Sequence, residues 1–289
     1  MTRLAILSDI HGNLSALEAV LHDLAGFAVD QVIIPGDTIH FGPASNSVAQ
    51  KILENNWPAI RGNNEYFLLA FDTPQAPAEW NDPIQFAPTR WTNQQISPQV
   101  KQGIERWPDS LELQFKDAPP LHVFHGTPNS PWEPIYATMP EADIAKLCTT
   151  VSADYLICGH THLPMDIQVG RWRIFNPGSV GLPLDGFRTA SYLLLDGTPK
   201  GWQPTFRRVE FDHAAVLQAF ETSGYNAHCG PMGRLIVEIH KTARPTFGFL
   251  AWRKEQHPLR AISDELLDEY LTTCEWWEYA LPPYRINMG

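Results

Sequence analysis

Seven Asp, Asn and His side chains stand at points where short apolar segments run out into loops. They are Asp9, His11, Asp37, Asn63, His125, His160 and His162. Carboxylate, amide and imidazole groups without a thiolate suit manganese, iron or zinc better than copper or an iron–sulfur cluster. The set therefore predicts a dinuclear metal centre, and with it the hydrolytic chemistry of a metal-activated water.

Asp37 has the properties of a ligand shared by two ions. It follows Gly36, where the backbone can turn sharply. A bridging ligand must offer two lone-pair oxygens and a negative charge, and a carboxylate has both. We therefore predict Asp37 as the bridge.

Two pairs of candidates have the same spacing. Asp9 and His11 are alternate residues of an extended segment and so face one side, and His160 and His162 repeat this arrangement. Each pair could hold one ion. Taken singly, the Asp residues could be turn or cap residues, and His125 could be a loop histidine bonded to the backbone. The agreement of all seven at successive strand ends favours metal binding.

A βαβαβ succession would position the first ligands. The expected elements are a strand at 4–8, an amphipathic helix at 14–24 capped by Asn13, a strand at 32–35, a helix at 44–55 and an extended segment at 58–61. Parallel strands of such a sheet end on one rim, where open α/β sheets bind their ligands. Asp9, Asp37 and Asn63 all follow these segments.

The rest of the chain predicts a lid, further strands and a helical tail. The Pro-rich segment 72–88 has no periodicity and is expected to form a loop or lid. The elements expected after it are two short helices, the second at 97–107, strands at 111–115 and 121–124, a helix at 141–150, a strand at 155–158, and antiparallel strands near 166–175, 190–196 and 205–211.

We predict a main domain at 1–211 and a mostly helical extension at 212–289. The main domain would carry a cap-like insertion at about 66–110 over the metal site. Helices are expected at 214–223 and 263–273, and the apolar segment 234–240 fits either helix or strand.

Composition excludes several other classes. The chain has 289 residues, 44% hydrophobic and 18% charged, with a net charge of -11. Such a balance argues against nucleic acid as a partner, because phosphate contacts need clustered Lys and Arg. The apolar runs fall short of the roughly 20 residues of a membrane span. No signal segment is recognised, and the four separated cysteines indicate reduced thiols, so the cytoplasm is expected. The sequence leaves the oligomeric state open.

The motifs, taken in order, resemble those of the calcineurin-like metallophosphoesterases. They are Asp-x-His, Gly-Asp, Gly-Asn-x-Glu, His-Gly and Gly-His-Thr-His. The turn at 176–181 and the segments at 41–43 and 188–192 resemble the small prokaryotic phosphodiesterase and phosphatase branch. The similarity covers residues 3 to about 210.

The resemblance implies an α/β fold, a four-layer αββα sandwich with two metals at the strand ends. One ion would be held by Asp9, His11, Asp37 and His162. The other would be held by Asp37, Asn63, His125 and His160. Manganese is the first choice of metal, with iron, zinc, nickel or cobalt as alternatives.

One position departs from the family pattern. Where a His commonly follows the Gly-Asn pair, this chain has Asn64, with Glu65 retained as a group that could orient a ring there. Asn can donate a hydrogen bond but supplies no proton, so general acid catalysis worth roughly 10²- to 10⁴-fold is expected to be missing. We predict Asn63, Asn64 and His160 as catalytic residues. His40 is kept as a candidate for substrate contact.

The function expected from these features is hydrolysis of small phosphodiesters or phosphomonoesters, nucleotides and dinucleoside polyphosphates among them. The attacking group would be a hydroxide that bridges the metals, aligned with the phosphorus. Two alternatives are a nuclease and a non-catalytic, protein-binding scaffold of the same fold. The acidic charge weakens the first, and the complete ligand set weakens the second.

Overall fold

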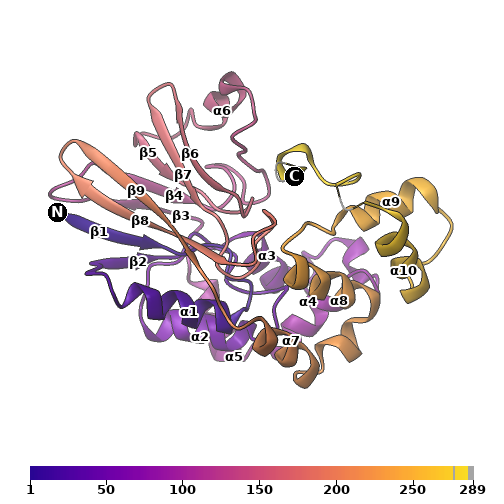
Figure 1. Cartoon of the computed structure of the whole chain (residues 1–289). Coiled ribbons are helices and arrows are strands. Elements are labelled where there is room, and N and C mark those ends of the chain that lie inside the picture. Colours follow the sequence, from indigo (N-terminus) through magenta and orange to yellow (C-terminus); the bar gives the residue numbers. More distant parts are fainter. Residues whose placement is uncertain (276, 286–289) are drawn as a thin grey trace.

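The computed structural model describes residues 1–275 and 277–285 and contains two stacked β-sheets (Figure 1). The first sheet has the order β2-β1-β8-β9, with β1 at Thr2–Ile6, β2 at Gln31–Ile33, β8 at Ala190–Thr198 and β9 at Gly201–Val209. The second has the order β3-β4-β5-β7-β6, with β3 at Ser110–Leu113, β4 at Leu121–Phe124, β5 at Tyr155–Ile157, β6 at Pro164–Val169 and β7 at Trp172–Pro177.

Helices cover the outer face of each sheet. The helices over the first sheet are α1 at Leu14–Leu24, α2 at Ser45–Glu54 and α5 at Pro98–Glu105. The second sheet is covered by α6 at Glu141–Leu147, which packs through Ile144 on side chains such as Leu156 and Ile174. The four-layer αββα sandwich that the resemblance implied is confirmed.

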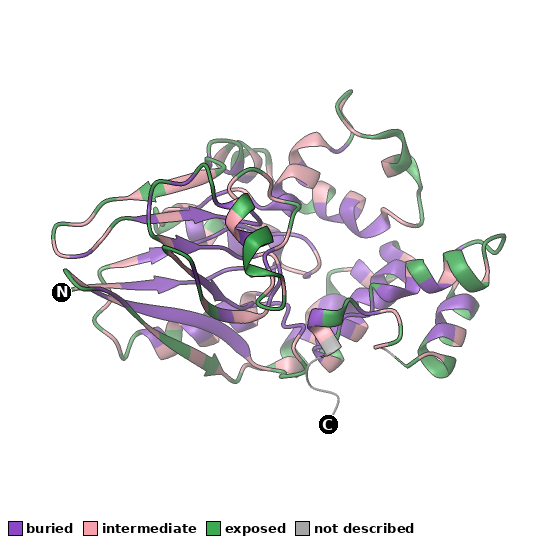
Figure 2. Ribbon diagram, turned by 90° about the horizontal axis from the view of Figure 1, so that it is seen from above, coloured by how far each residue is buried: buried purple, intermediate pink, exposed green. Residues whose placement is uncertain are grey.

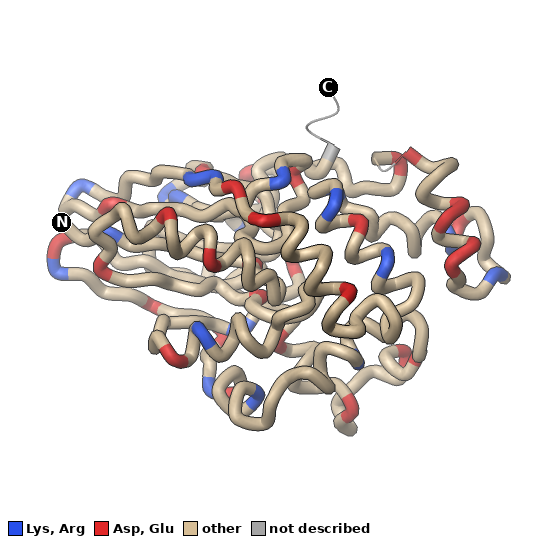
Figure 3. Tube along the Cα trace, turned by 60° about the horizontal axis from the view of Figure 1, so that its bottom comes forward, with Lys and Arg blue, Asp and Glu red and all other residues tan. Residues whose placement is uncertain are grey.

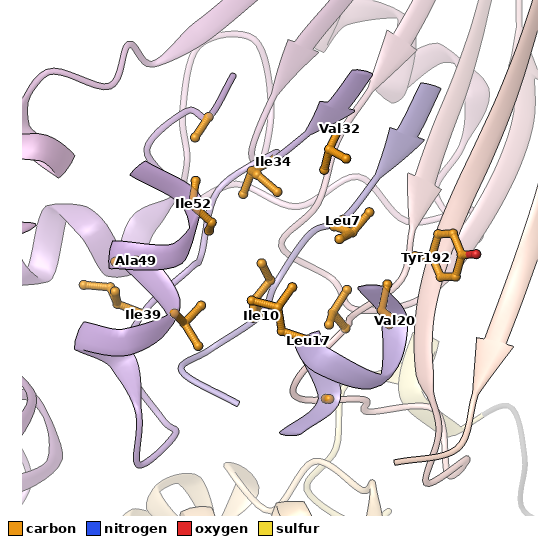
Figure 4. Close-up of a cluster of buried hydrophobic side chains, with 14 of the residues drawn as sticks. Leu7, Ile10, Leu17, Val20, Val32, Ile34, Ile39, Ala49, Ile52 and Tyr192 are labelled. Atoms are coloured by element: carbon orange, nitrogen blue, oxygen red, sulfur yellow. The ribbon is translucent and has the colours of Figure 1, made fainter. Parts of the chain in front are cut away.

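The alternation of β1 shows how the layers hold together. Leu4 and Ile6 belong to the cluster between the two sheets, while Ala5 and Leu7 belong to the cluster beneath the helices. Successive side chains of a strand point to opposite faces, so one short strand contributes to both cores. Figure 4 shows Leu7 in the helix-side cluster, and Figure 2 shows the buried strands enclosed by exposed loops and helix faces.

The helices of the insertion and of the C-terminal extension form further hydrophobic core beside the sandwich. Its elements are α3 at Asn63–Ala70, η1 at Ala78–Asn81, α4 at Ala87–Gln95, α7 at His213–Thr222, α8 at Tyr225–Thr242, α9 at Gly248–Gln256, α10 at Asp264–Thr273 and η2 at Pro282–Arg285. Trp91 of α4 packs edge-on against Tyr225 of α8 at a centroid distance of 4.9 Å. The insertion and the C-terminal extension therefore share one apolar cluster, which also includes Leu182 and Leu184 of the main domain.

Several expected elements differ from the structure. The segment 166–175 is a hairpin of two strands, β6 and β7, that turns at Gly170, where φ is +55°. β7 pairs parallel to β5, so the late strands are only partly antiparallel. The segment 234–240, which the sequence left undecided between helix and strand, is helical. It lies within α8, which is kinked at Gly230 and Pro231. Residues 286–289 of the expected extension lie outside the described residues.

Within the described part of the chain, no helix meets the length and apolarity that a bilayer-spanning segment requires.

The turn at Gly181 presses on the first metal-site loop and should tolerate no side chain. Its N–H donates to the carbonyl of Asp9 at 3.1 Å, and a Cβ there would overlap the carbonyl oxygen of Ile10. We expect Gly181→Ala to lower the free energy of unfolding by about 1–3 kcal/mol, as overpacking does. Gly26→Ala is the matched control, because a Cβ there meets only the carbonyl of Asp23 at 3.4 Å. Equal denaturation midpoints for the two variants would contradict this account.

Candidate metal centre

The seven candidate ligands converge at one edge of the sandwich, where four strands end. Asp9 and His11 follow β1, and Asp37 follows β2. The others are Asn63 at the first turn of α3, His125 after β4, and His160 and His162 after β5. Both sheets thus direct their carboxyl ends to the same place, as the βαβ pattern predicts.

The backbone of this edge is strained. Positive φ values occur at Asp9 (54°), His11 (48°), Asp37 (50°), His160 (68°) and His162 (59°). Each such residue costs on the order of 1–3 kcal/mol and persists only where its surroundings hold it. Here the loops hold one another, because the N–H of Asp9 donates to the Gly36 carbonyl at 3.2 Å and that of His11 to the Asp37 carbonyl at 3.0 Å.

The first donor group comprises Asp9, His11, Asp37 and His162, all buried, whose ligand atoms lie within 4.8 Å of one another. The Nε2 of His162 is 3.3 Å from Asp9 Oδ1 and 3.1 Å from the Nε2 of His11. The same His11 nitrogen is 3.6 Å from Asp37 Oδ2.

The second donor group comprises Asp37, His125 and His160, again within 4.8 Å. Asn63 joins it, because its Oδ1 lies 3.1 Å from His125 Nε2 and 2.9 Å from His160 Nδ1. Asp37 Oδ2 is 3.3 Å from His125 Nε2. Among the described residues, Asp37 alone belongs to both groups.

Three of the histidine rings are oriented by backbone carbonyls. His125 donates from Nδ1 to Pro35 at 2.8 Å, His162 from Nδ1 to Leu182 at 2.5 Å, and His160 from Nε2 to Trp132 at 3.1 Å. Each ring therefore turns its other nitrogen to the centre, the arrangement that outer partners impose on metal ligands. Ring nitrogens and carboxylate oxygens that converge in this way fit a cation between them.

The charge states suit the same role. Burial opposes a charge on Asp37, but His125 and His11 beside it hold its pKa well below the usual range. Burial lowers the pKa of His11 to about 3 and that of His160 to about 4, so both rings are neutral at pH 7. Despite burial, Asp37 raises the pKa of His125 to about 10. A cation beside Asp37 would replace that proton, since metal binding releases protons from its ligands.

Glu65 is a functional residue whose role the sequence did not reveal. Its fully buried carboxylate accepts from the N–H groups of Asp37 (3.0 Å) and Gly62 (2.7 Å) through Oε2, and of Thr38 (2.8 Å) and Ile39 (3.3 Å) through Oε1. It therefore fastens the bridging loop to the start of α3. The spacing from Gly62 to Glu65 is that of a capping box and was the available signal. Because both oxygens are used, Glu65 is not free to orient a ring at position 64.

Asn64 is bonded to Asp37 rather than free in the site. Its backbone N–H donates to Asp37 Oδ1 at 2.9 Å, and its Nδ2 to Oδ2 at 2.6 Å. Its Oδ1 lies 2.5 Å from His40 Nδ1, and His40 Nε2 is 3.1 Å from Thr89 Oγ1. His40 is buried behind Asn64 and is not among the residues that line the cavity, so the expectation that it contacts substrate finds no support.

A cavity of about 440 Å³ opens over the two donor groups. Its outer wall comes from the C-terminal extension, through residues 245–251 of α9 and its approach and residues 279–284. Residues 72–88, where a cap was expected, contribute none of the described lining. Trp80 of that segment instead packs on Phe67 at 4.6 Å, and Phe67 meets Trp132 edge-on at 5.0 Å. The segment therefore packs beside Phe67 and outside the described cavity lining.

Comparison with known proteins agrees with this fold and site. The family described as "Calcineurin-like phosphoesterase superfamily domain" matches residues 2–199. The chain belongs to this superfamily of metal-dependent enzymes that hydrolyse phosphoric esters.

Two curated relatives cover most of the sandwich. The chain is 26% identical to the uncharacterized protein MJ0912 of Methanocaldococcus jannaschii over 235 residues, 75% of this chain and 90% of that protein. It is 29% identical to phosphodiesterase YfcE of Escherichia coli over 211 residues, 68% of this chain and 88% of that enzyme.

Solved structures extend the likeness further along the chain. A metallophosphoesterase from Sphaerobacter thermophilus superposes with a TM-score of 0.67 at 26% identity, covering 84% of this chain and 99% of that one. The hypothetical protein PH1004 of Pyrococcus horikoshii superposes with a TM-score of 0.71 at 19% identity, with the same coverage, and shows the fold alone.

Replacing the Glu65 carboxylate should loosen the metal loops. In Glu65→Gln, an amide NH2 would face two backbone N–H donors, so we expect a loss of about 2–3 kcal/mol in the free energy of unfolding, together with lower metal content. Glu54→Gln is the control, because Glu54 is exposed and its side chain accepts from Gln50, itself on the surface. Denaturant titration and metal analysis measure the two effects. An unchanged unfolding curve for Glu65→Gln would show that the four hydrogen bonds to Glu65 do not stabilise the fold.

Proposed function

We propose that the chain is a dinuclear phosphoesterase, with manganese as the preferred metal, that hydrolyses small phosphoesters. The observation that carries the proposal is the membership of Asp37 in both donor groups. Asp9, His11, Asp37 and His162 would hold one ion; Asp37, Asn63, His125 and His160 would hold the other. Divalent ions bound there would supply Lewis acidity, which activates water as the nucleophile and offsets charge on the phosphoryl group.

The side chains around the ions would have separate roles in the reaction. Asn63 lies at the cavity, and its Nδ2 amide would help to hold the phosphoryl oxygens as their charge grows. His160 would act through the ion that it holds, because its Nε2–H donates to the carbonyl of Trp132. Asn64 positions the Asp37 carboxylate through two hydrogen bonds. Its effect on the reaction would therefore come through Asp37, the proposed bridging ligand. Neither Asn supplies a proton. The departing oxygen is then left to carry its own charge, which favours esters with good leaving groups.

Phosphodiesters are the substrates that we favour, because the curated relative YfcE is named a phosphodiesterase. Phosphomonoesters, nucleotides and dinucleoside polyphosphates are the further classes that a substrate panel should include. We propose the cytoplasm as the compartment, in keeping with four free cysteines.

The two alternatives find less support. A nuclease needs a basic groove, but Figure 3 shows the Lys and Arg residues scattered among acidic ones. Several are also paired, as Arg207 is with Asp23 and Arg173 with Asp166. A binding scaffold needs neither a complete donor set nor strained ligand loops, and both are present here.

Asp37→Asn should abolish turnover and reduce metal content. The amide has one acceptor oxygen and no charge, so it cannot serve two cations. Chelation of the wild type should lower its melting temperature, because ions that bind only the folded state stabilise it. Asp143→Asn, an exposed position paired with Lys146, is the control and should keep both ions. An Asp37→Asn protein with two ions and full rate would refute the shared carboxylate.

The rate should depend steeply on the leaving group. With no proton donor at position 64, we expect kcat to fall as the pKa of the departing alcohol or phenol rises, and aryl diesters to outpace alkyl monoesters by at least roughly 10²-fold. Steady-state kinetics with a series of substituted aryl esters measures this slope. A flat series with chemistry rate-limiting would mean that another group provides the proton.

A further inference from the structure

The cavity joins a polar floor to an apolar wall. The floor is formed by the donor groups, and the wall by Leu182, Leu184, Pro245, Phe247, Leu281 and Tyr284. None of the described lining residues is Lys or Arg. A volume of about 440 Å³ is in the usual range for a small-molecule site, and it exceeds what a phosphate group alone requires.

The wall is fastened to the metal loops at two points. Phe247 packs on Phe41 at a centroid distance of 5.6 Å, and Phe41 stacks on His40 at 3.9 Å. Tyr284 meets Tyr136 of the main domain edge-on at 5.9 Å, with their hydroxyls 3.4 Å apart. The C-terminal segment in Figure 1 lies between the loops of the second sheet and α9. The extension therefore completes the wall of the cavity over the donor groups.

Charge balance limits what this site can hold. Two divalent cations outweigh the carboxylates of Asp9 and Asp37 by two positive charges, which suits one phosphoryl group. A second phosphate on the same substrate would face the apolar wall, where no described lining residue offers a cation. A buried charge without a partner is costly. A ring or alkyl group in the same place would gain from burial.

Resting on the proposed function, we infer that the C-terminal extension builds a pocket for one uncharged, apolar or aromatic ester group. The favoured substrate is then a phosphoester with a single phosphoryl group. Nucleoside polyphosphates and dinucleoside polyphosphates are disfavoured, because their further phosphates would meet no cation among the described lining residues.

Three probes that share one leaving group test the inference. They are phenyl p-nitrophenyl phosphate, thymidine 5′-(p-nitrophenyl phosphate), and the same thymidine ester carrying a 3′-phosphate. The manganese-loaded protein should show the highest kcat/KM for the phenyl diester and the lowest for the 3′-phosphorylated ester. The two values of kcat/KM should differ by at least about 10- to 100-fold, which is the contribution of burying one ring. Equal kcat/KM for the phenyl diester and the 3′-phosphorylated ester would overturn the inference.

A cation placed in the wall should reduce the difference in kcat/KM between the phenyl diester and the 3′-phosphorylated ester. Leu281 lines the cavity and is 57% exposed, so Leu281→Lys should fold, and it should raise kcat/KM for the 3′-phosphorylated ester about five-fold relative to the phenyl diester. Leu259→Lys is the matched control, because Leu259 is 98% exposed and lies outside the cavity lining. An unchanged ratio of the two kcat/KM values in Leu281→Lys, or an equal change in Leu259→Lys, would contradict the proposed role of the apolar wall.

A binding measurement separates this inference from the proposed function. If no probe is hydrolysed, the proposed function fails, but calorimetry with phenylphosphonate and methylphosphonate still tests the pocket. Phenylphosphonate should bind at least about ten-fold more tightly, and Phe247→Ala should reduce that difference. Equal affinities would overturn the pocket even in an active enzyme.

Discussion

The carboxylate of Asp37 is the point on which the rest of the site depends. Its Oδ2 faces His125 at 3.3 Å and His11 at 3.6 Å, one from each donor group. Asn64 fixes its orientation by donating to both oxygens. A small rotation of this side chain would move it out of both groups together. The proposed sharing of two ions therefore depends on the geometry of this one side chain.

The fold holds that carboxylate by placing strained loops against one another. The loop after β2 adopts φ of +50° at Asp37, a conformation that a non-glycine residue keeps only when its neighbours enforce it. Glu65 enforces it by accepting three consecutive N–H groups of that loop, from Asp37 to Ile39. The hydrogen bonds that satisfy these buried amides thus hold the strained backbone that carries Asp37.

Sequence patterns predicted the centre better than its surroundings. The order of short strands and the residues at their ends were sufficient to bring all seven candidate ligands to one edge, because parallel strands in βαβ units must end on one rim. The spacing argument that paired His160 with His162 on one ion was wrong, because the two rings belong to different donor groups. The wall of the cavity was not predictable in this way. Phe247 and Tyr284 lie more than a hundred residues beyond His125, and no local periodicity links them to it. The Pro-rich segment 72–88 follows Asn63 closely in sequence, yet its Trp80 packs on Phe67 and no residue of the segment is among the described cavity lining.

The sequence left one helix undecided where its local signals conflict, at 234–240 within α8. Pro231 and two glycines interrupt the pattern of α8, although the buried face that includes Leu235 and Ile239 continues through it. The sequence predicted for Glu65 only that it could orient a ring at position 64. Its carboxylate faces the backbone of another loop, and such a long-range contact leaves no mark in the spacing of residues beyond the capping box.

The most direct test of this account is electron paramagnetic resonance of the manganese-loaded protein. Two Mn²⁺ ions that share the Asp37 carboxylate should be magnetically coupled and give the spectrum of an exchange-coupled pair, which should disappear in Asp37→Asn. A wild-type spectrum of isolated Mn²⁺ ions at full metal loading would contradict the shared bridge.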